Sequence, residues 1–222
     1  MDYPALELID FHAWQQQGPG TLIQGLNVRI AQGETFAFLS RSASARQLLV
    51  DSLIGRHPHK HGSIRILNNE TSHLDEEAVC RYGMIHCDPD QGIVPHLNCQ
   101  ENLLLPPLGP NLIGGGLPLL EIFLLFPRLK KAQRALSSSL DPCLRLQLSW
   151  ARALRTGANI MILKNLGTYL IGANLEQTHA LLMQLNQRNY TIILIEEENS
   201  ALLDYIQNQY SMEQWAQVPT LR

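Results

Sequence analysis

The residues with the clearest chemical potential lie between two apolar elements, in the stretch from Ser40 to Gln47. An apolar run at 35–39 precedes them, and a helical pattern at 46–54 follows. An apolar strand that runs through a loop of small residues into a helix is the layout of a phosphate-binding loop, which normally reads G-x-x-x-x-G-K-S/T. The corresponding positions here are Ser40, Ala45, Arg46 and Gln47. The sequence therefore keeps the frame of such a loop and changes its chemistry.

Three other groups of polar residues are candidates for chemistry. The histidines of residues 57–61 alternate, but no Cys or carboxylate adjoins them, which favours a solvated turn over a metal site. The acidic residues 196–198 offer a metal site or a base, and the simpler interpretation is acidic residues at a helix N-terminus, where the helix dipole favours them. The basic residues of 128–134 fit a nucleic-acid or lipid-headgroup patch, yet the net charge of -3 favours an ordinary solvated face.

The composition is that of an ordinary globular protein. The 222 residues are 45% hydrophobic and 17% charged, enough for one core in a single domain. The net charge of -3 gives no electrostatic reason to expect nucleic acid. The 4 cysteines form no C-x-x-C pair, so neither a zinc ribbon nor a disulfide framework is indicated and a reducing cytosol is expected. The N-terminus does not resemble a signal peptide, and the apolar run 112–127 is too short and interrupted to span a bilayer.

The elements that must position these residues follow from hydrophobic periodicity and turn residues. Strands interleaved with helices predict an α/β fold with a mainly parallel sheet, and the alternating N-terminal third predicts an antiparallel β part. We expect one domain, 1–222, with an α/β core at 1–87 and 156–222 and a helical subdomain at 88–155. The predicted strands are 5–11, 22–30, 35–39, 62–66, 83–87, 159–163 and 191–195, and the predicted helices are 46–54, 76–81, 100–105, 117–126, 144–155, 174–188 and 200–207.

The order of segments resembles the ATP-binding subunits of ABC transporters, with the closest likeness to subunits of branched-chain amino-acid importers. The likeness runs from about Leu6 to about Tyr205. It is carried by LNVRIAQGETFAFL before the loop, IVPHLNCQENLLL, LFPRLK, WARAL, NIMIL and TIILIEE, in the family's order and at matching spacing. The resemblance implies a P-loop NTPase core of the ABC ATPase type.

In that family the loop's backbone N–H groups hold the phosphates, a Lys reaches the β- and γ-phosphates, and a Ser or Thr hydroxyl holds Mg²⁺. Arg46 keeps a positive charge at the Lys position with a bulkier planar group, and Gln47 offers an amide in place of the hydroxyl. Side chains in place of glycines obstruct the approach of the backbone to a phosphate. The nucleotide-binding positions that the resemblance implies, all degenerate, are Ser40, Ser42, Ala43, Ala45, Arg46, Gln47 and Lys164.

The other motif positions also depart from the family. The Mg²⁺-coordinating Asp is replaced by Lys164, a reversal of charge, and the residue that polarises the attacking water is replaced by Asn165, which cannot accept a proton. The switch position, His or Gln in these proteins, is Glu197. The adenine-stacking aromatic has no clear counterpart, since the ungapped match is Gln17 and Trp14 requires a small shift.

The family's signature motif, which contacts the γ-phosphate bound by the opposite subunit, falls on Asp141, Pro142 and Cys143. A carboxylate there would face phosphate, and Pro142 has no N–H to donate. Loss at the loop, signature, metal position and switch predicts a protein with no catalytic residues and no metal site.

We therefore expect a catalytically inactive ABC-ATPase-like subunit that acts as a structural or regulatory partner in a membrane-associated complex. Expected partners are an ABC-type permease or another ATPase subunit at the cytoplasmic face of the membrane, in a homo- or heterodimer, without nucleic acid. No cofactor is expected, and weak ATP binding stays open. Two alternatives remain: an importer ATPase with weak or atypical activity, and an interaction module no longer linked to transport.

Overall fold

The computed structural model describes residues 3–15, 22–105, 116–169 and 173–215. Its strands are β1 (Leu6–Trp14), β2 (Leu22–Ile30), β3 (Thr35–Leu39), β4 (Lys60–Ile66), β5 (Asn69–Glu70), β6 (Met84–Cys87), β7 (Ile160–Lys164), β8 (Thr191–Glu196) and β9 (Asn208–Ser211). Its α-helices are α1 (Ala43–Leu53), α2 (Glu76–Arg81), α3 (Cys99–Leu104), α4 (Leu119–Leu125), α5 (Pro127–Lys131), α6 (Pro142–Thr156) and α7 (Ala173–Gln187). Short 3₁₀ helices span Ser137–Ser139, Leu166–Tyr169, Ala201–Tyr205 and Met212–Trp215.

A five-stranded parallel sheet forms the centre of the fold, in the order β6-β7-β8-β3-β9. Its middle strands β7 and β8 are apolar runs with nearly every residue buried. Such runs are typical of parallel strands because both faces of the sheet are covered. The prediction of an α/β fold with a mainly parallel sheet is confirmed.

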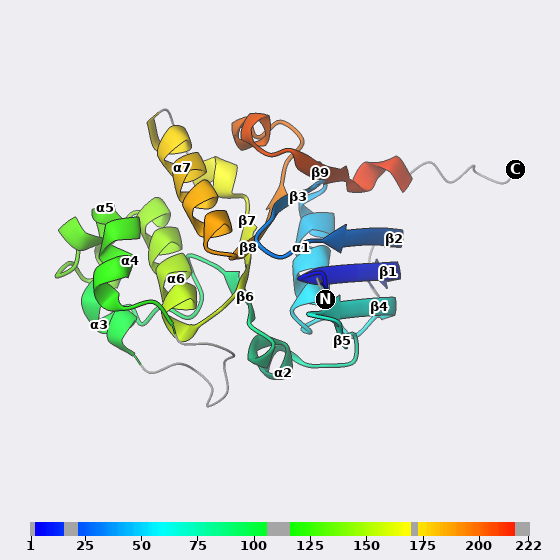
Figure 1. Ribbon diagram of the computed structural model, residues 1–222, viewed down its shortest axis with the longest axis horizontal. Coiled ribbons are helices and arrows are strands. Elements are labelled where there is room, and N and C mark those ends of the chain that lie inside the picture. Colours follow the sequence, from blue (N-terminus) through cyan, green and yellow to red (C-terminus); the bar gives the residue numbers. More distant parts are fainter. Residues whose placement is uncertain (1–2, 16–21, 106–115, 170–172, 216–222) are drawn as a thin grey trace, which may run out of the picture.

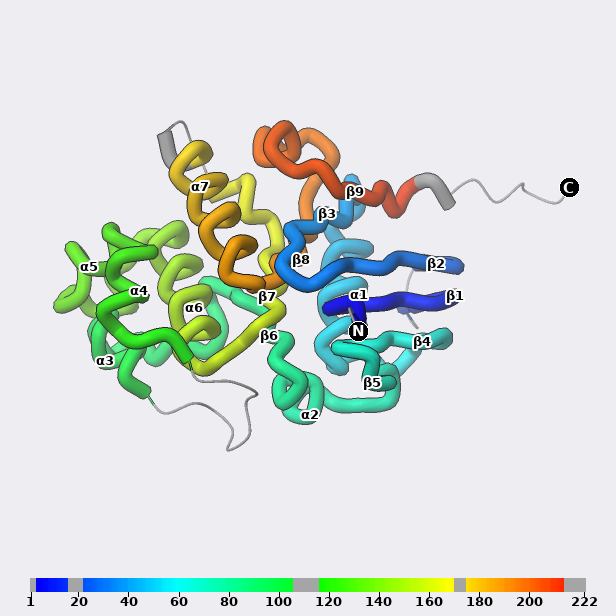
Figure 2. Tube along the Cα trace, in the orientation of Figure 1, coloured from blue at the N-terminus to red at the C-terminus, as the bar shows by residue number. Residues whose placement is uncertain are grey.

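Two apolar cores lie on the two faces of this sheet. One core joins the sheet to α1 and to an antiparallel sheet of order β2-β1-β4-β5, so that α1 lies between the two sheets (Figure 1). The other core joins the opposite face to α3, α4, α6 and α7 (Figure 1, Figure 2). The predicted antiparallel N-terminal part is confirmed, and the division at 88–155 stays a prediction because one core runs across it.

The C-terminal part differs from expectation. A helix was expected at 200–207, but the chain forms a 3₁₀ helix at Ala201–Tyr205 and then the strand β9, which pairs with β3 in parallel. In Figure 2 this segment runs along the edge of the sheet beside β3. After the 3₁₀ helix the backbone pairs with the open edge of β3, which satisfies its hydrogen-bonding groups in place of further helical turns.

Two helices begin earlier than expected. Helix α1 begins at Ala43 instead of residue 46, and α6 begins at Pro142 instead of residue 144. Both starts are set by a side chain that accepts a hydrogen bond from the first turn, Ser42 for α1 and Asp141 for α6. The earlier start of α1 places predicted nucleotide-binding positions in its first turn, and the earlier start of α6 places signature-equivalent positions in its first turn. Among the described residues, no helix is long and apolar enough to cross a membrane.

Candidate functional site

The loop between β3 and α1 is folded as a helix cap. The Ser42 hydroxyl accepts from the Ala45 N–H at 3.2 Å, and the Arg46 N–H donates to the Ser42 carbonyl at 3.1 Å. Ala43 and Ala45 are therefore residues of the first helical turn and do not belong to an open loop. The cap satisfies the Ala45 N–H, one of the backbone N–H groups that an anion at a helix N-terminus would otherwise take.

Arg46 is turned inward and forms internal bonds with both ends of its guanidinium. Only 3% of the residue is exposed. One terminal nitrogen donates to the Ser40 carbonyl at 2.6 Å, and the other donates to Glu197 Oε1 at 2.9 Å. The positions predicted as loop cation and switch thus meet as an ion pair, which links the loop to the segment after β8.

Gln47 and Lys164 also lie in contact, as the resemblance requires of the metal-binding positions. The Lys164 ammonium donates to Gln47 Oε1, and the Gln47 amide donates to Asp51 Oδ1 at 2.9 Å. Lys164 is the last residue of β7, so the sheet places its side chain beside α1. Mg²⁺ requires oxygen ligands around a compact cation site, and here an ammonium occupies the position that would hold the metal's charge. These residues do not fit Mg²⁺, and the described chain has no group of three His, Cys, Asp or Glu residues that could hold a metal.

Asn165 has a backbone conformation that suits its residue type. Its φ is 53°, in the left-handed region that Asn tolerates better than most residues. Its N–H donates to the Ile195 carbonyl at 2.9 Å, which ties the end of β7 to β8. Asn165 Oδ1 is buried and has no hydrogen-bond partner among the described residues. The left-handed backbone conformation favours Asn at this position.

Glu196, at the end of β8, is a buried carboxyl that sequence reasoning did not separate from its neighbours. It is 1% exposed and accepts from the Gly167 N–H at 3.3 Å. Burial raises the pKa of Glu196 to about 7, although the N–H groups of Gly167 and Leu166 and the charge of Arg46 act in the opposite direction. The acidic run 196–198 does not lie at the N-terminus of an α-helix, so that interpretation is wrong.

We expect Glu196→Gln to stabilise the protein at pH 8. The folded-state pKa of about 7 lies above the ordinary 4.5, so the contribution of Glu196 to stability falls as the pH rises from 4.5 to 7 and stays low above. Removing the ionisable group should raise the free energy of unfolding by up to about 3 kcal/mol at pH 8 and leave it unchanged at pH 4. Urea unfolding at both pH values measures this.

Glu198→Gln is the matched control, since Ser211 and Arg41 hold the pKa of Glu198 below its ordinary value and its loss should destabilise near neutral pH. A Glu196→Gln protein less stable than the parent at pH 8 would contradict the prediction.

Two carboxylates from the chain after β8, Glu198 and Glu213, also contact the loop between β3 and α1. The Arg41 N–H donates to Glu213 Oε1 at 2.6 Å, and the Arg41 guanidinium donates to Glu198 at 2.7 Å. The Ser40 hydroxyl lies 3.5 Å from the same Glu213 oxygen. Glu213 lies in the 3₁₀ helix Met212–Trp215, directly after β9, and the pairing of β9 with β3 brings it to this position. No sequence signal identified Glu213 or Arg41, because their meeting depends on a short polar strand that periodicity does not detect.

The signature-equivalent residues form the start of α6. Asp141 Oδ1 accepts from the Leu144 N–H at 2.8 Å, and Pro142 takes the first helical position, where its missing N–H costs nothing. Arg128 donates to Asp141 at 3.4 Å and to Cys143 Sγ at 3.3 Å. These contacts account for all three residue types through helix capping and packing. Gln17 lies outside the described residues, and Trp14 is at the far end of β1 beside His59.

Comparison with known proteins supports the fold over nearly the whole chain. An ATP-binding cassette of an ABC transporter, MJ1267 in its ADP conformation, matches 94% of this chain and 87% of its own length with TM-score 0.75 and 15% identity. The protein cbiO1 from Clostridium perfringens, described as part of the ABC transporter complex cbiONQ, matches 95% and 85% with TM-score 0.70 and 17% identity. Dimeric MJ0796, a bacterial ABC transporter cassette, matches 93% of each chain with TM-score 0.74 and 17% identity.

Sequence comparison gives a shorter match. The sn-glycerol-3-phosphate import ATP-binding protein UgpC 1 of Rhizobium etli is 27% identical over 99 residues, 45% of this chain and 27% of that protein. UgpC 2 of Rhizobium johnstonii is 26% identical over the same length. The match spans about a quarter of the length of these curated relatives. No family model matches the chain. Together with the parallel sheet and the loop between β3 and α1, the structural matches show that the chain has the fold of the ATP-binding cassettes of ABC transporters.

Proposed function

We propose that this chain is a catalytically inactive member of the ABC ATPase family that serves as a structural or regulatory subunit of a transporter-like complex. The observation that carries the proposal is the contact between the Lys164 ammonium and Gln47 Oε1. These are the positions at which the family would hold Mg²⁺, and one of them supplies a cation of its own. A second positive charge at that point would be repelled.

The residues around this contact also support an inactive site. Arg46 is bonded to Ser40 and Glu197, so its charge is neutralised inside the chain. The Arg41 N–H and guanidinium are bonded to Glu213 and Glu198, so carboxylates of the chain lie where an incoming phosphate would need donors. A nucleotide would have to displace three carboxylates and then bind without a metal.

The first alternative is an importer ATP-binding subunit with weak or atypical activity. It is compatible with the fold and with the UgpC match, and it requires the loop to reopen on binding. The second alternative is an interaction module unconnected with transport. The likeness to branched-chain amino-acid importers within the family rests on the quoted segments and stays a sequence-based prediction.

We expect the purified protein to show no saturable MgATP binding at micromolar concentration and no ATP hydrolysis above background. Isothermal titration with MgATP, together with a phosphate-release assay, tests this. Titration with ATP in EDTA shows whether binding fails because the metal is repelled or because the loop cannot hold phosphate. A loop that still holds phosphate would bind ATP in EDTA. Micromolar binding of MgATP would favour the first alternative and contradict the proposal.

The proposed partners are an ABC-type permease or another ATPase subunit, at the cytoplasmic face of the membrane. MJ0796 is described as dimeric and cbiO1 as part of a transporter complex, which is the basis for proposing both a homo- or heterodimer and a membrane-associated assembly. Affinity purification from membranes of the native cell, solubilised in detergent, distinguishes this from the interaction module. Recovery of a permease supports the proposal, and recovery only from the soluble fraction without a permease supports the module.

A further inference from the structure

Helix α4 is apolar on both of its faces. Ile122 and Phe123 are buried in the core, whereas Leu120 and Leu124 are 68% and 70% exposed. These two leucines are four residues apart, so they lie on the same face of the helix. The sequence of α4 contains a single charged residue. A helix that is hydrophobic all round is normally buried all round, so we expect the outward face of α4 to have a partner.

A groove of about 290 Å³ lies beside this face, between α4, α5 and α7. Leu124 lines it from α4, and Arg128, which is bonded to Asp141, is the single charged residue among the described residues that line it. Lys131 follows Arg128 by three residues and lies on the same side of α5. In Figure 1, α4 and α5 form one end of the molecule, opposite β1 and β2. The exposed leucines of α4 therefore adjoin the basic residues of α5.

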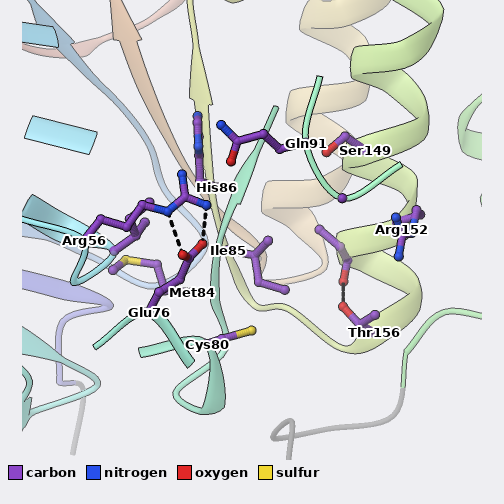
Figure 3. A pocket seen from close by; sticks show the side chains of 13 residues that line it. Arg56, Glu76, Cys80, Met84, Ile85, His86, Gln91, Ser149, Arg152 and Thr156 are labelled. Atoms are coloured by element: carbon purple, nitrogen blue, oxygen red, sulfur yellow. Dashed lines mark hydrogen bonds and ion pairs between the residues drawn. The ribbon is translucent and has the colours of Figure 1, made fainter. Parts of the chain in front are cut away.

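The cations of this segment are not neutralised by the chain itself. Residues 117–136 contain one acidic and four basic residues, a net charge of +3 in a chain of net charge -3. Elsewhere arginines pair locally: Arg56 donates two hydrogen bonds of 2.6 Å to Glu76 (Figure 3). Lys130, Lys131 and Arg134 are exposed and form no ion pair with another described residue. The net charge of the whole chain therefore hides a local positive excess.

We propose that α4 and α5 form a docking surface for an anionic lipid bilayer, with Leu120 and Leu124 at the acyl boundary and Lys130, Lys131 and Arg134 among the headgroups. Exposed apolar side chains beside lysines and arginines are typical of helices that lie in a membrane interface. An anionic bilayer complements both parts of the surface, whereas an acidic polymer would meet the cations and leave the leucines exposed. The surface requires neither a nucleotide nor a permease, so it goes beyond the proposed function.

The test is co-sedimentation of the purified full chain with vesicles of phosphatidylcholine, either alone or with about 30% phosphatidylserine. Binding should require phosphatidylserine and should weaken as the salt concentration rises, because ions screen the attraction to the headgroups. The triple variant Lys130→Gln, Lys131→Gln and Arg134→Gln should weaken binding about a hundredfold, which is about fivefold for each cation removed.

A second variant tests the apolar part of the surface separately. Leu120→Gln with Leu124→Gln keeps every charge and a good helix former at both positions, and it should weaken binding about tenfold because the apolar contact is lost. Leu22→Gln with Arg29→Gln is the matched control. Both residues are exposed on β2, at the opposite end of the molecule (Figure 1), and this variant should bind like the parent.

Three results would contradict the proposal. Equal binding to the two kinds of vesicle, or unchanged binding of the triple variant, would overturn the role of the cations. Unchanged binding of the leucine variant would overturn the lipid assignment, and comparable binding of poly-L-glutamate would then identify an acidic protein partner. No sedimentation at about 5 mM lipid, well above the ~0.1 mM at which a single myristoyl chain partitions, would overturn the surface altogether.

Discussion

We expect Trp150→Ala to lower the free energy of unfolding by about 4 kcal/mol, the range for a large aromatic side chain removed from a packed core. Trp150 is 2% exposed. Its ring packs edge-on against Phe126 at 5.6 Å between centroids, and its indole N–H lies 3.1 Å from Met161 Sδ. The side chain therefore joins the segment before α5, helix α6 and strand β7 in one core, and its removal leaves a cavity at their junction.

Urea unfolding followed by circular dichroism measures the loss without relying on tryptophan fluorescence. Trp14→Ala is the matched control, because Trp14 is 39% exposed and its removal should cost less than about 1 kcal/mol. Since one apolar cluster runs from β7 and β8 into α3, α4 and α6, both variants should unfold in a single transition. Two separated transitions in Trp150→Ala would instead indicate that residues 88–155 unfold as a unit of their own.

The central sheet was predictable because its strands are defined by local chemistry. The runs NIMIL and TIILI each begin with one polar residue and continue with apolar residues alone. This composition is typical of strands that are buried on both faces of a sheet. Strand β9, with the sequence Asn-Gln-Tyr-Ser, carries no such pattern. It exists because β3 offers an open edge, and that edge depends on the whole sheet being formed. Periodicity in the sequence cannot report a strand whose stability comes from its neighbour.

The candidate site was predictable only in part, for a related reason. The frame of motifs placed Gln47 and Lys164 near each other, and the structure brings them into contact. The frame identified Arg46 and Glu197 as motif positions, but it did not predict that they form an ion pair. The cap at Ser42 was readable from a serine before a helical pattern, but the glycine-loop template placed the helix start three residues later. The capping role of Asp141 was hidden in the same way, because the template assigned that position to phosphate contact.

We expect the pair Lys164→Asp and Asn165→Glu to leave MgATP turnover at background, although it restores the family's residues after β7. The cap at Ser42 and the bonds from Arg46 to Ser40 and Glu197 remain, so the Ala45 N–H and the Arg46 guanidinium stay bonded within the chain and are not available to phosphate. Asn165→Glu also places a poor left-handed residue at φ 53°, at a cost of about 1 kcal/mol.

The double variant Lys164→Asp and Asn165→Glu should also change the pKa of His86. This pKa reports the altered charge independently of turnover. The positive charge of Lys164 helps to lower the pKa of His86, so replacing it with a carboxylate should raise that pKa above about 4. Proton NMR titration of His86 measures the shift, and Lys131→Asp at an exposed position of α5, a similar charge change outside the site, should not produce it. A raised His86 pKa with turnover still at background means that the charge reversal succeeded and the loop itself prevents catalysis. Turnover above background would show instead that Ser40, Ala45 and residues 141–143 tolerate nucleotide chemistry, and the inactive assignment would be wrong.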